Sequence, residues 1–407
     1  MPSMSNRSLP RVSVIIPTYN RAGYLREALD SVVSQSLVPE EIIVVDDGST
    51  DDTPDVVEVY RPRVSYVRHH QNRGIAPARN SGLNAANGDV IAWLDSDDLW
   101  EPDFLMTVVS LLSEDETLDG AYTGITMINK EGTSLGVSTR TESLNDLYDA
   151  LVRDCFLATP AVVARQICYE QVGGFDPQFR ISEDYDMWLR LSKRFRLVGI
   201  PLPLVRIRVH PSNTMADTDT LCKARLTLTQ KHFGQLGESA RDLTGASRAA
   251  YGYAFRSIGL KYIESGQPSK GWRFLEQAAE LHPEILERTD TFYELVCADQ
   301  SRGYRGRAEM LDIPANGAEM LQRLDTLFAK TPKPVRDLRR VAYGNAYVVL
   351  AMLSDQAGHW DDARRYILQA FKANPRLIGS WSLIRRWLKL CSGQKLVNAA
   401  RTLYARD

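Results

Sequence analysis

The chain has 407 residues, 44% of them hydrophobic, and this length predicts two or three domains with packed cores. No apolar run approaches the length of a membrane span, and the polar residues 1–10 contain no signal segment. The five cysteines form no Cys-x-x-Cys pair. We therefore expect a cytoplasmic protein with reduced thiols, no zinc site and a disordered N-terminus over residues 1–10.

The two halves of the chain differ in charge, although the net charge is only −2. Residues 1–215 carry 20 basic and 30 acidic side chains, whereas residues 216–407 carry 29 and 21. An acidic front half fits a site that uses a metal ion. The basic back half indicates an anionic surface or partner, or simply a solvated basic helical face. No nucleic-acid partner is expected.

The first hundred residues alternate between apolar strands and amphipathic helices. We predict strands at 11–16, 41–45, 64–68 and from 90, and helices at 23–34, from 53 and at 74–86. Pro17 should end the first strand, and Asn20 is placed to cap the first helix. This order predicts a parallel sheet with helices on both faces. Because neither Gly-x-Gly-x-x-Gly nor a phosphate-binding Gly-Lys-Ser/Thr follows a strand, a bound nucleotide would be held by acids, a metal and arginines instead.

Three carboxylates follow the strand that begins at Val90, namely Asp95, Asp97 and Asp98. Acids at the carboxyl end of a buried strand repel one another, and a divalent cation such as Mg²⁺ or Mn²⁺ would relieve that repulsion. Ligands bind at this edge of an open α/β sheet. The alternative is a turn that leads to a helix starting at Pro102.

Further elements continue the pattern toward residue 215. A helix is expected from Pro102 to about 113, a strand at 120–128, and mixed or antiparallel edge strands after it. Ser182 should cap a helix from Glu183 to about 193, with carboxylates in its first turn, where the helix dipole favours them. A strand at 205–209 then leads to His210.

Taken together, several short motifs resemble family 2 glycosyltransferases over about residues 9–215. They are Val-Ser-Val-Ile-Ile-Pro-Thr-Tyr-Asn-Arg (12–21), Val-Val-Asp-Asp-Gly-Ser-Thr-Asp (44–51), Asn-Arg-Gly-Ile-Ala-Pro-Ala-Arg-Asn-Ser-Gly (72–82), Trp-Leu-Asp-Ser-Asp-Asp (93–98), Gly-Gly-Phe-Asp (173–176) and Glu-Asp-Tyr-Asp-Met-Trp-Leu-Arg (183–190). The resemblance implies a GT-A fold, which is an α/β, Rossmann-like mixed sheet with helices on both faces. It also implies a nucleotide-diphosphate-sugar donor, most often a UDP-sugar, with Mn²⁺ or Mg²⁺ as cofactor.

The same resemblance implies roles for individual residues. Asp184 would be the general base, with Glu183 and Asp186 as rivals. Asp97, Asp95 and His210 would meet the metal, and Asp98 is a weaker candidate. Nucleotide-sugar contacts fall on Pro17, Thr18, Tyr19, Asn20, Asp46, Asp47, Arg79, Asp95 and Ser96. Structural alternatives stay open: Asp184 as a helix-start acid, Asp46 as a cap for the turn at Gly48, and His210 as a turn residue before Pro211. Trp93 and Trp188 are expected in the core.

From about residue 216 the pattern becomes all-helical. Residues 266–283 and 358–375 share Gly, Arg, aromatic, Ala and Pro at matching places and resemble the tetratricopeptide helix pair. Residues 301–340 fit that pattern poorly. Such repeats bind a protein partner, mediate self-association or brace the catalytic domain. Residues 381–390 mix aromatics with cations, which predicts either a last helix that caps the repeats or a helix at a membrane surface, giving peripheral contact with the inner face.

The resemblance thus implies an inverting, metal-dependent glycosyltransferase in polysaccharide or glycan assembly. The acceptor would be a glycan, a lipid-linked sugar or a protein. The alternative is a non-catalytic nucleotide-sugar-binding scaffold whose helical half recruits a protein partner. The domain boundaries expected are 11–215 for the GT-A domain and 216–407 for the helical region.

Overall fold

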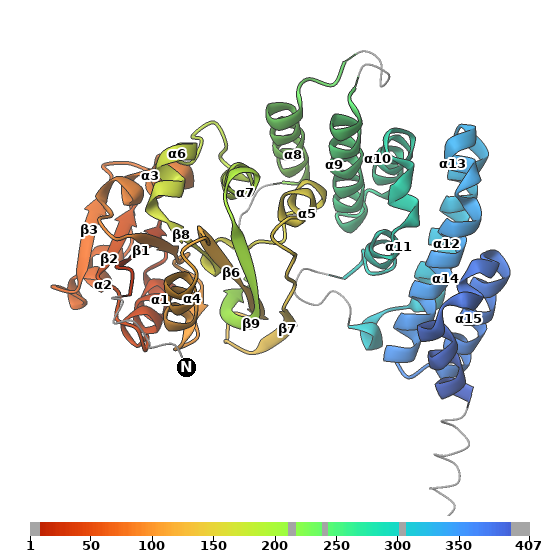
Figure 1. Cartoon of the computed structure of the whole chain (residues 1–407), viewed down its shortest axis with the longest axis horizontal. Helices are drawn as coiled ribbons and strands as arrows, with labels where there is room; N and C mark the ends of the chain where they lie inside the picture. Colours follow the sequence, from red (N-terminus) through yellow and green to blue (C-terminus); the bar gives the residue numbers. More distant parts are fainter. Residues whose placement is uncertain (1–8, 211–216, 238–242, 301–306, 392–407) are drawn as a thin grey trace, which may run out of the picture. The chain divides into compact units, whose positions relative to one another are not determined.

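The computed structural model describes residues 9–210, 217–237, 243–300 and 307–391 (Figure 1). The chain divides into two compact units, residues 1–216 and 217–407. The first is an α/β domain and the second is all-helical, which confirms the predicted fold classes. Most of the expected disordered N-terminus lies outside the described residues.

One nine-stranded mixed sheet forms the first unit. Its order is β3-β2-β1-β4-β8-β6-β9-β5, with β7 paired to β6. The first four strands in the chain are parallel, as predicted, and β8 then pairs antiparallel to both β4 and β6. The strands are β1 (Val12–Thr18), β2 (Glu41–Asp46), β3 (Val64–Arg68), β4 (Val90–Trp93), β5 (Leu99–Trp100), β6 (Gly120–Ile128), β7 (Ser134–Ser138), β8 (Val162–Arg165) and β9 (Leu197–Arg208).

Helices cover both faces of this sheet. They are α1 (Ala22–Val33), α2 (Thr53–Val59), α3 (Ile75–Ala85), α4 (Phe104–Glu114), α5 (Leu147–Arg153), α6 (Gln166–Val172) and α7 (Glu183–Arg194). All of β1 is buried, because alternate residues face opposite helix layers. Val14 and Ile16 join the core that includes α1 and α4, while Ile15 lies against Gly82 of α3. A Cβ at Gly82 would stand 2.3 Å from the Ile15 side chain, so glycine allows the helix to approach the sheet closely.

Several elements differ from expectation. Pro17 does not end β1, which continues to Thr18. Pairing with β4 stops at Ile15, so at Pro17 the strand pairs only with β2 and tolerates a missing N–H. The last strand, β9, is longer than the predicted 205–209. The short elements β7, α5, β8 and α6 were not individually predicted, because each is too short to give a clear apolar period.

The second unit is a stack of helices. They are α8 (Thr218–Phe233), α9 (Gly245–Glu264), α10 (Pro268–Leu281), α11 (Thr289–Val296), α12 (Ile313–Lys330), α13 (Lys333–Asp337), α14 (Arg339–Gln356), α15 (Trp360–Ala373) and a helix over 381–391. A core of its own runs through α9, α10, α12, α14 and α15. No helix in the described ranges combines the length and apolarity needed to cross a membrane.

The two segments noted as similar form equivalent helix pairs. In each pair a glycine with positive φ follows the first helix, Gly266 at φ 77° and Gly358 at φ 77°. Inside the first helices, Gly252 and Gly344 allow close contact with the residue just past the second helix. The pairs α9–α10 and α14–α15 are therefore built alike, while the tetratricopeptide assignment itself stays a prediction.

The helix over 381–391 packs one face on this unit. Leu390 belongs to the helical core and Trp387 contacts it, whereas Trp381 and Leu388 are exposed. This packing is what a capping helix needs. Contact with a membrane stays a prediction.

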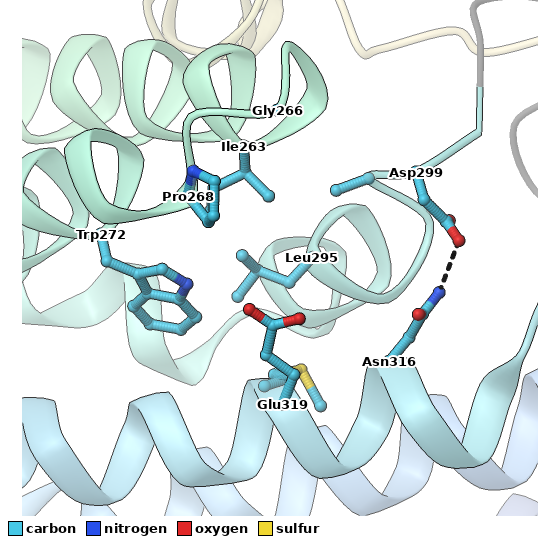
Figure 2. A pocket seen from close by; sticks show the side chains of 10 residues that line it. Ile263, Gly266, Pro268, Trp272, Leu295, Asp299, Asn316 and Glu319 are labelled. Carbon is cyan, nitrogen blue, oxygen red and sulfur yellow. Dashed lines mark hydrogen bonds between the residues drawn. The ribbon is translucent and has the colours of Figure 1, made fainter.

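The described part of the helical unit has at least two hollows. One, of about 200 Å³, lies between the α9–α10 turn, α11 and α12. Figure 2 shows the Glu319 carboxylate beside the Trp272 and Leu295 side chains, with the Asn316 amide bonded to Asp299 at its rim. The charged residues that line this first hollow, Asp299 and Glu319, are therefore both acidic. The second hollow, of about 360 Å³, lies on α14 and α15 and contains arginine, lysine and tyrosine side chains.

Replacing Gly344 tests the close approach within the second helix pair. A Cβ there would stand 2.6 Å from Cβ of Asn374, so Gly344→Ala must push the chain apart. We expect a loss of about 1–3 kcal/mol in local stability, measured by hydrogen exchange of the α14 and α15 amides. In the matched control Gly245→Ala, the new Cβ meets no atom within 4 Å, and stability should hold or rise. Equal exchange in both variants would contradict the close-packing explanation.

Candidate functional site

Most of the predicted site residues gather at one edge of the sheet. β1, β2 and β4 all end there, because parallel strands place their carboxyl ends together. Thr18 ends β1 beside Asp46 at the end of β2, and Asp95 and Asp97 follow β4. Arg79 of α3 reaches the same edge.

A buried guanidinium connects two groups of acids. The Arg79 side chain is 4% exposed, and its Nη2 donates to Asp95 Oδ1 at 2.8 Å. Its Nη1 donates to Glu183 Oε1 at the start of α7. The Asp-x-Asp turn after β4 and the acids of α7, far apart in sequence, are therefore parts of one site.

Burial and charge oppose each other at this cluster. Burial raises the pKa of Glu183 to about 7; the Arg79 charge opposes that rise, and the nearby Asp184 charge adds to it. Burial also raises the pKa of Asp95, against the pull of Arg79. For Arg79 itself burial acts to lower the pKa, but the Asp95 and Glu183 carboxylates overcome it and raise the value. Arg79 thus stays charged, and Nε of the same guanidinium is buried with no hydrogen-bond partner in the described part of the chain.

The three acids of α7 have different surroundings. Glu183 is held by Arg79, and Asp186 is fully buried and bonded to Arg190 Nε at 2.9 Å. Asp184 is only partly buried, and its Oδ2 accepts a 3.2 Å hydrogen bond from Thr159 Oγ1. Of the three, Asp184 is the carboxylate most open to a bound molecule.

Ser182 does not cap α7 as predicted. It occupies the cap position with φ 68°, in the left-handed region, and its side chain makes no capping bond. This conformation is costly for a residue other than glycine, and such strain concentrates at functional sites.

Asp97 and His210 face each other across the site. His210 Nε2 lies 3.0 Å from Asp97 Oδ2, and Arg21 Nε lies 3.8 Å from the same oxygen. The His210 ring stacks on Tyr24 at a centroid distance of 4.8 Å. Because His210 follows β9 and Asp97 follows β4, the fold rather than the sequence spacing brings them together.

Asp98 is used within the protein. Its Oδ1 accepts a 2.8 Å bond from the Arg208 backbone N–H, and burial together with the Asp97 charge raises its pKa well above the usual range. The buried Arg208 guanidinium donates in turn to the Asp97 carbonyl and to Glu27. Arg208 therefore fixes the turn that carries the acids, a role that sequence reasoning missed.

Two neighbouring acids at the end of β2, Asp46 and Asp47, have different surroundings. Asp46 is fully buried, and it accepts bonds from the Ser49 backbone N–H at 2.7 Å and the Tyr66 hydroxyl at 2.5 Å. Burial and this carboxylate raise the Tyr66 pKa. Thr18 Oγ1, opposite Asp46 in the strand register, is buried with no hydrogen-bond partner among the described residues. An unsatisfied hydroxyl at a ligand-binding edge indicates a place for an incoming polar group.

Asp47 holds the loop that precedes α3. Both of its oxygens accept from the Arg73 N–H, one also accepts from the Gly74 N–H, and His69 Nδ1 lies 2.6 Å from Oδ1. His69 Nε2 meets Ser81 Oγ on α3. This arrangement gives Asp47 a structural role in the loop, which no sequence motif revealed.

The remaining predicted residues line the start of α1 and the acid turn. Asn20 does not cap α1: the cap position is Arg21, and Asn20 Oδ1 instead accepts from the Thr50 N–H, with φ 51° at Asn20. Tyr19 is 43% exposed. Pro17 and Ser96 are buried at the same edge.

The Gly-Gly-Phe motif is hydrogen-bonded to α3. Asn80 Nδ2 donates to the Phe175 carbonyl and its Oδ1 accepts from the Phe175 N–H, each at 2.7 Å. The Phe175 ring lies against Trp93 and 5.3 Å from the Arg79 guanidinium. Trp93 and Trp188 are both fully buried, as expected. The motif thus places the Phe175 ring in contact with Arg79.

Comparisons with known proteins give the family of this chain. A family model for glycosyl transferase family 2 matches residues 13–166. A putative teichuronic acid biosynthesis glycosyltransferase, TuaG of Bacillus subtilis, is 35% identical over 190 residues, which cover 46% of this chain and 73% of that protein. An uncharacterized glycosyltransferase of Rickettsia typhi is 31% identical over 51% of this chain and 67% of its own. The chondroitin synthase of Pasteurella multocida is 33% identical over 46% of this chain and 19% of its own.

Solved structures similar to this chain include Staphylococcus aureus TarS, with 17% identity, a TM-score of 0.43, and coverage of 89% of this chain and 91% of the other. A mannosyltransferase of Pyrobaculum calidifontis, PcManGT, in complex with GDP-Man and Mn²⁺, has 20% identity and a TM-score of 0.46, with coverage of 87% and 88%. The family match over residues 13–166 and the identity to TuaG across most of that protein lead to one conclusion: the chain belongs to glycosyltransferase family 2.

Proposed function

We propose that this protein transfers a sugar from a nucleotide-diphosphate sugar to an acceptor hydroxyl, with inversion at the anomeric carbon and with help from a divalent metal. The observation that carries the proposal is the Arg79 bridge, because it joins the acids after β4 to the acids that begin α7. A transferase of this kind needs carboxylates for two tasks, metal binding and proton removal, around one donor.

The nucleotide binds at the ends of β1 and β2 in this proposal. Thr18 Oγ1, which lies beside Asp46, and the exposed Tyr19 ring supply a hydroxyl and a flat apolar surface. These groups suit the base and ribose of a nucleotide. UDP-sugars are the first donors to test, because the family resemblance most often implies a UDP-sugar.

The metal binds at Asp97 in this proposal, with His210 beside it. In the described part of the chain, no three Asp, Glu, His or Cys side chains gather closely enough to hold an ion alone. Mg²⁺ and Mn²⁺ fit such a sparse site, because Mg²⁺ in particular keeps several waters and binds through one or two carboxylates plus substrate phosphates. The Asp97 and His210 side chains converge to 3.0 Å and would supply the protein's share. When bound, the ion neutralises charge that develops on the departing diphosphate.

The chemical step is a single displacement at the anomeric carbon. The acceptor oxygen forms a bond to that carbon while the bond to the nucleotide diphosphate breaks, and the acceptor proton passes to Asp184. Asp184 is suited to this role because it is partly exposed at the first turn of α7, whereas Glu183 and Asp186 are tied to arginines. Arg79 holds Asp95 and Glu183 in position and adds positive charge near the reacting centre.

Polysaccharide or glycan assembly is the proposed setting. TuaG is described as acting in teichuronic acid biosynthesis, and another relative is a chondroitin synthase. A glycan or a lipid-linked sugar is the acceptor class to test first.

The first prediction concerns the base. Asp184→Asn should lower kcat about 10²–10⁴-fold and leave donor binding intact, because it removes general-base help alone. Rates are measured by release of nucleotide diphosphate together with product sugar transfer. Glu183→Gln is the matched comparison. If Glu183 were the base, the rate would fall as the pH drops below about 7, because burial raises the pKa of this carboxyl to about 7. The Glu183→Gln variant would then lose this pH dependence. Full activity of Asp184→Asn would overturn the assignment.

The second prediction concerns the metal. A nucleotide diphosphate at about 100 times its Kd should add about 2.7 kcal/mol of stability when Mn²⁺ is present. Asp97→Ala should abolish this stabilisation, followed as a shift in Tm. Asp55→Ala, which removes an exposed acid of α2 in the same domain, should keep it. An unchanged shift in Asp97→Ala would show that Asp97 does not hold the metal. A protein that binds nucleotide but transfers no sugar to any acceptor would be a scaffold.

A further inference from the structure

The hollow on α14 and α15 is strongly basic. Arg339, Arg340 and Lys372 line it, and none of its lining residues is acidic. Arg339 pairs with Asp325 at 2.9 Å, whereas the Arg340 and Lys372 side chains make no hydrogen bond or ion pair within the described ranges. Both side chains are exposed. Two uncompensated cations at one hollow favour an anionic occupant.

Aromatic rings share this hollow with the cations. Tyr343 and Tyr347 line it from successive turns of α14, and both are half-buried. The Tyr343 hydroxyl donates to Asp325 at 2.6 Å, and the Tyr347 ring stacks on Tyr366 at a centroid distance of 6.3 Å. Both rings are therefore held in place before any ligand arrives. Rigid aromatic rings beside cations recognise flat or ring-shaped anions at a small entropic cost.

The equivalent surface of the first helix pair is built differently. Tyr251 and Phe255 occupy the places of Tyr343 and Tyr347, but both are buried, and α8 packs on their helix. Glu280 stands where the second pair has Lys372. The shared helix-pair architecture therefore does not require the half-buried tyrosines and the added cation, so these features are particular to the second pair.

We propose that this hollow binds an acidic oligosaccharide. The pyranose rings would lie on Tyr343 and Tyr347, and the carboxylates or other anionic groups of the sugar would meet Arg340 and Lys372. The choice of a glycan rests on the proposed function, because a transferase that builds a glycan needs to hold the growing chain. The volume of about 360 Å³ lies within the range of small-molecule pockets. The acidic hollow beside Trp272 and Glu319 has the opposite charge and serves as an internal contrast (Figure 2).

Titration calorimetry of the full chain with oligogalacturonate and hyaluronan oligosaccharides tests the proposal, with chitin oligosaccharides as neutral controls. The acidic glycans should bind and the neutral ones should bind at least about tenfold more weakly. Arg340→Glu with Lys372→Glu should weaken acidic-glycan binding about tenfold or more, and added salt should weaken it in the wild type. The charge-matched pair Lys223→Glu with Arg273→Glu, exposed on α8 and α10, should bind as the wild type does, as should Glu319→Gln.

Tyr347→Leu separates sugar recognition from simple attraction between charges. It keeps apolar volume but removes the ring, so oligosaccharide binding should fall while binding of inorganic polyphosphate stays unchanged. Circular dichroism checks that each variant is folded. The proposal is wrong if neither acidic glycan binds, if the Arg340/Lys372 variant binds as the wild type does, or if Tyr347→Leu has no effect.

Failure of this proposal can be told apart from failure of the proposed function. Asp97→Ala should lose the metal-dependent nucleotide effect and keep oligosaccharide binding, whereas the Arg340/Lys372 variant should show the reverse. Loss of both properties in the Arg340/Lys372 variant would contradict a separate site on the helical unit.

Discussion

The buried Arg79 guanidinium is the interaction on which the site depends. It sits in a part of the protein where an unpaired charge is costly, and it is tolerated because Asp95 and Glu183 bond to it from two sides. Removing either acid would leave a charge without compensation. Two further contacts hold the guanidinium near these acids. Asn80 is hydrogen-bonded to the Phe175 backbone, and the Phe175 ring lies against Arg79. One cation therefore fixes the relative positions of a sheet edge and a helix start.

Much of the α/β domain could be predicted from the sequence, because buried parallel strands give continuous apolar runs and their carboxyl ends must lie together. The different roles of neighbouring acids could not be predicted from the sequence. Asp46 and Asp47 are adjacent, yet one is next to the unsatisfied Thr18 and the other fastens a loop. Similarly, Glu183, Asp184 and Asp186 share one helical turn, and only tertiary contacts decide which carboxylate stays open. Sequence spacing carries no information about those contacts.

The helical unit shows the same limit in another form. Glycine, aromatic and proline spacing predicted two similar segments, and the structure contains two equivalent helix pairs there. The pattern could not predict which faces would be covered, since burial of Tyr251 depends on α8 and exposure around Tyr347 depends on what packs beside α14. Arg340 and Lys372 come from different helices and meet only after α14 and α15 fold together.

The paired glycines of the two helix pairs stand apart from the residues that line the basic hollow. Gly252 and Gly344 sit on the inner side of each pair, where they set the approach of the helices, and Gly266 and Gly358 set the turns. None of these four positions lies in the basic hollow. The glycines that set the helix packing and the residues that line the basic hollow occupy separate positions. A substitution in the hollow therefore leaves these glycine contacts unchanged.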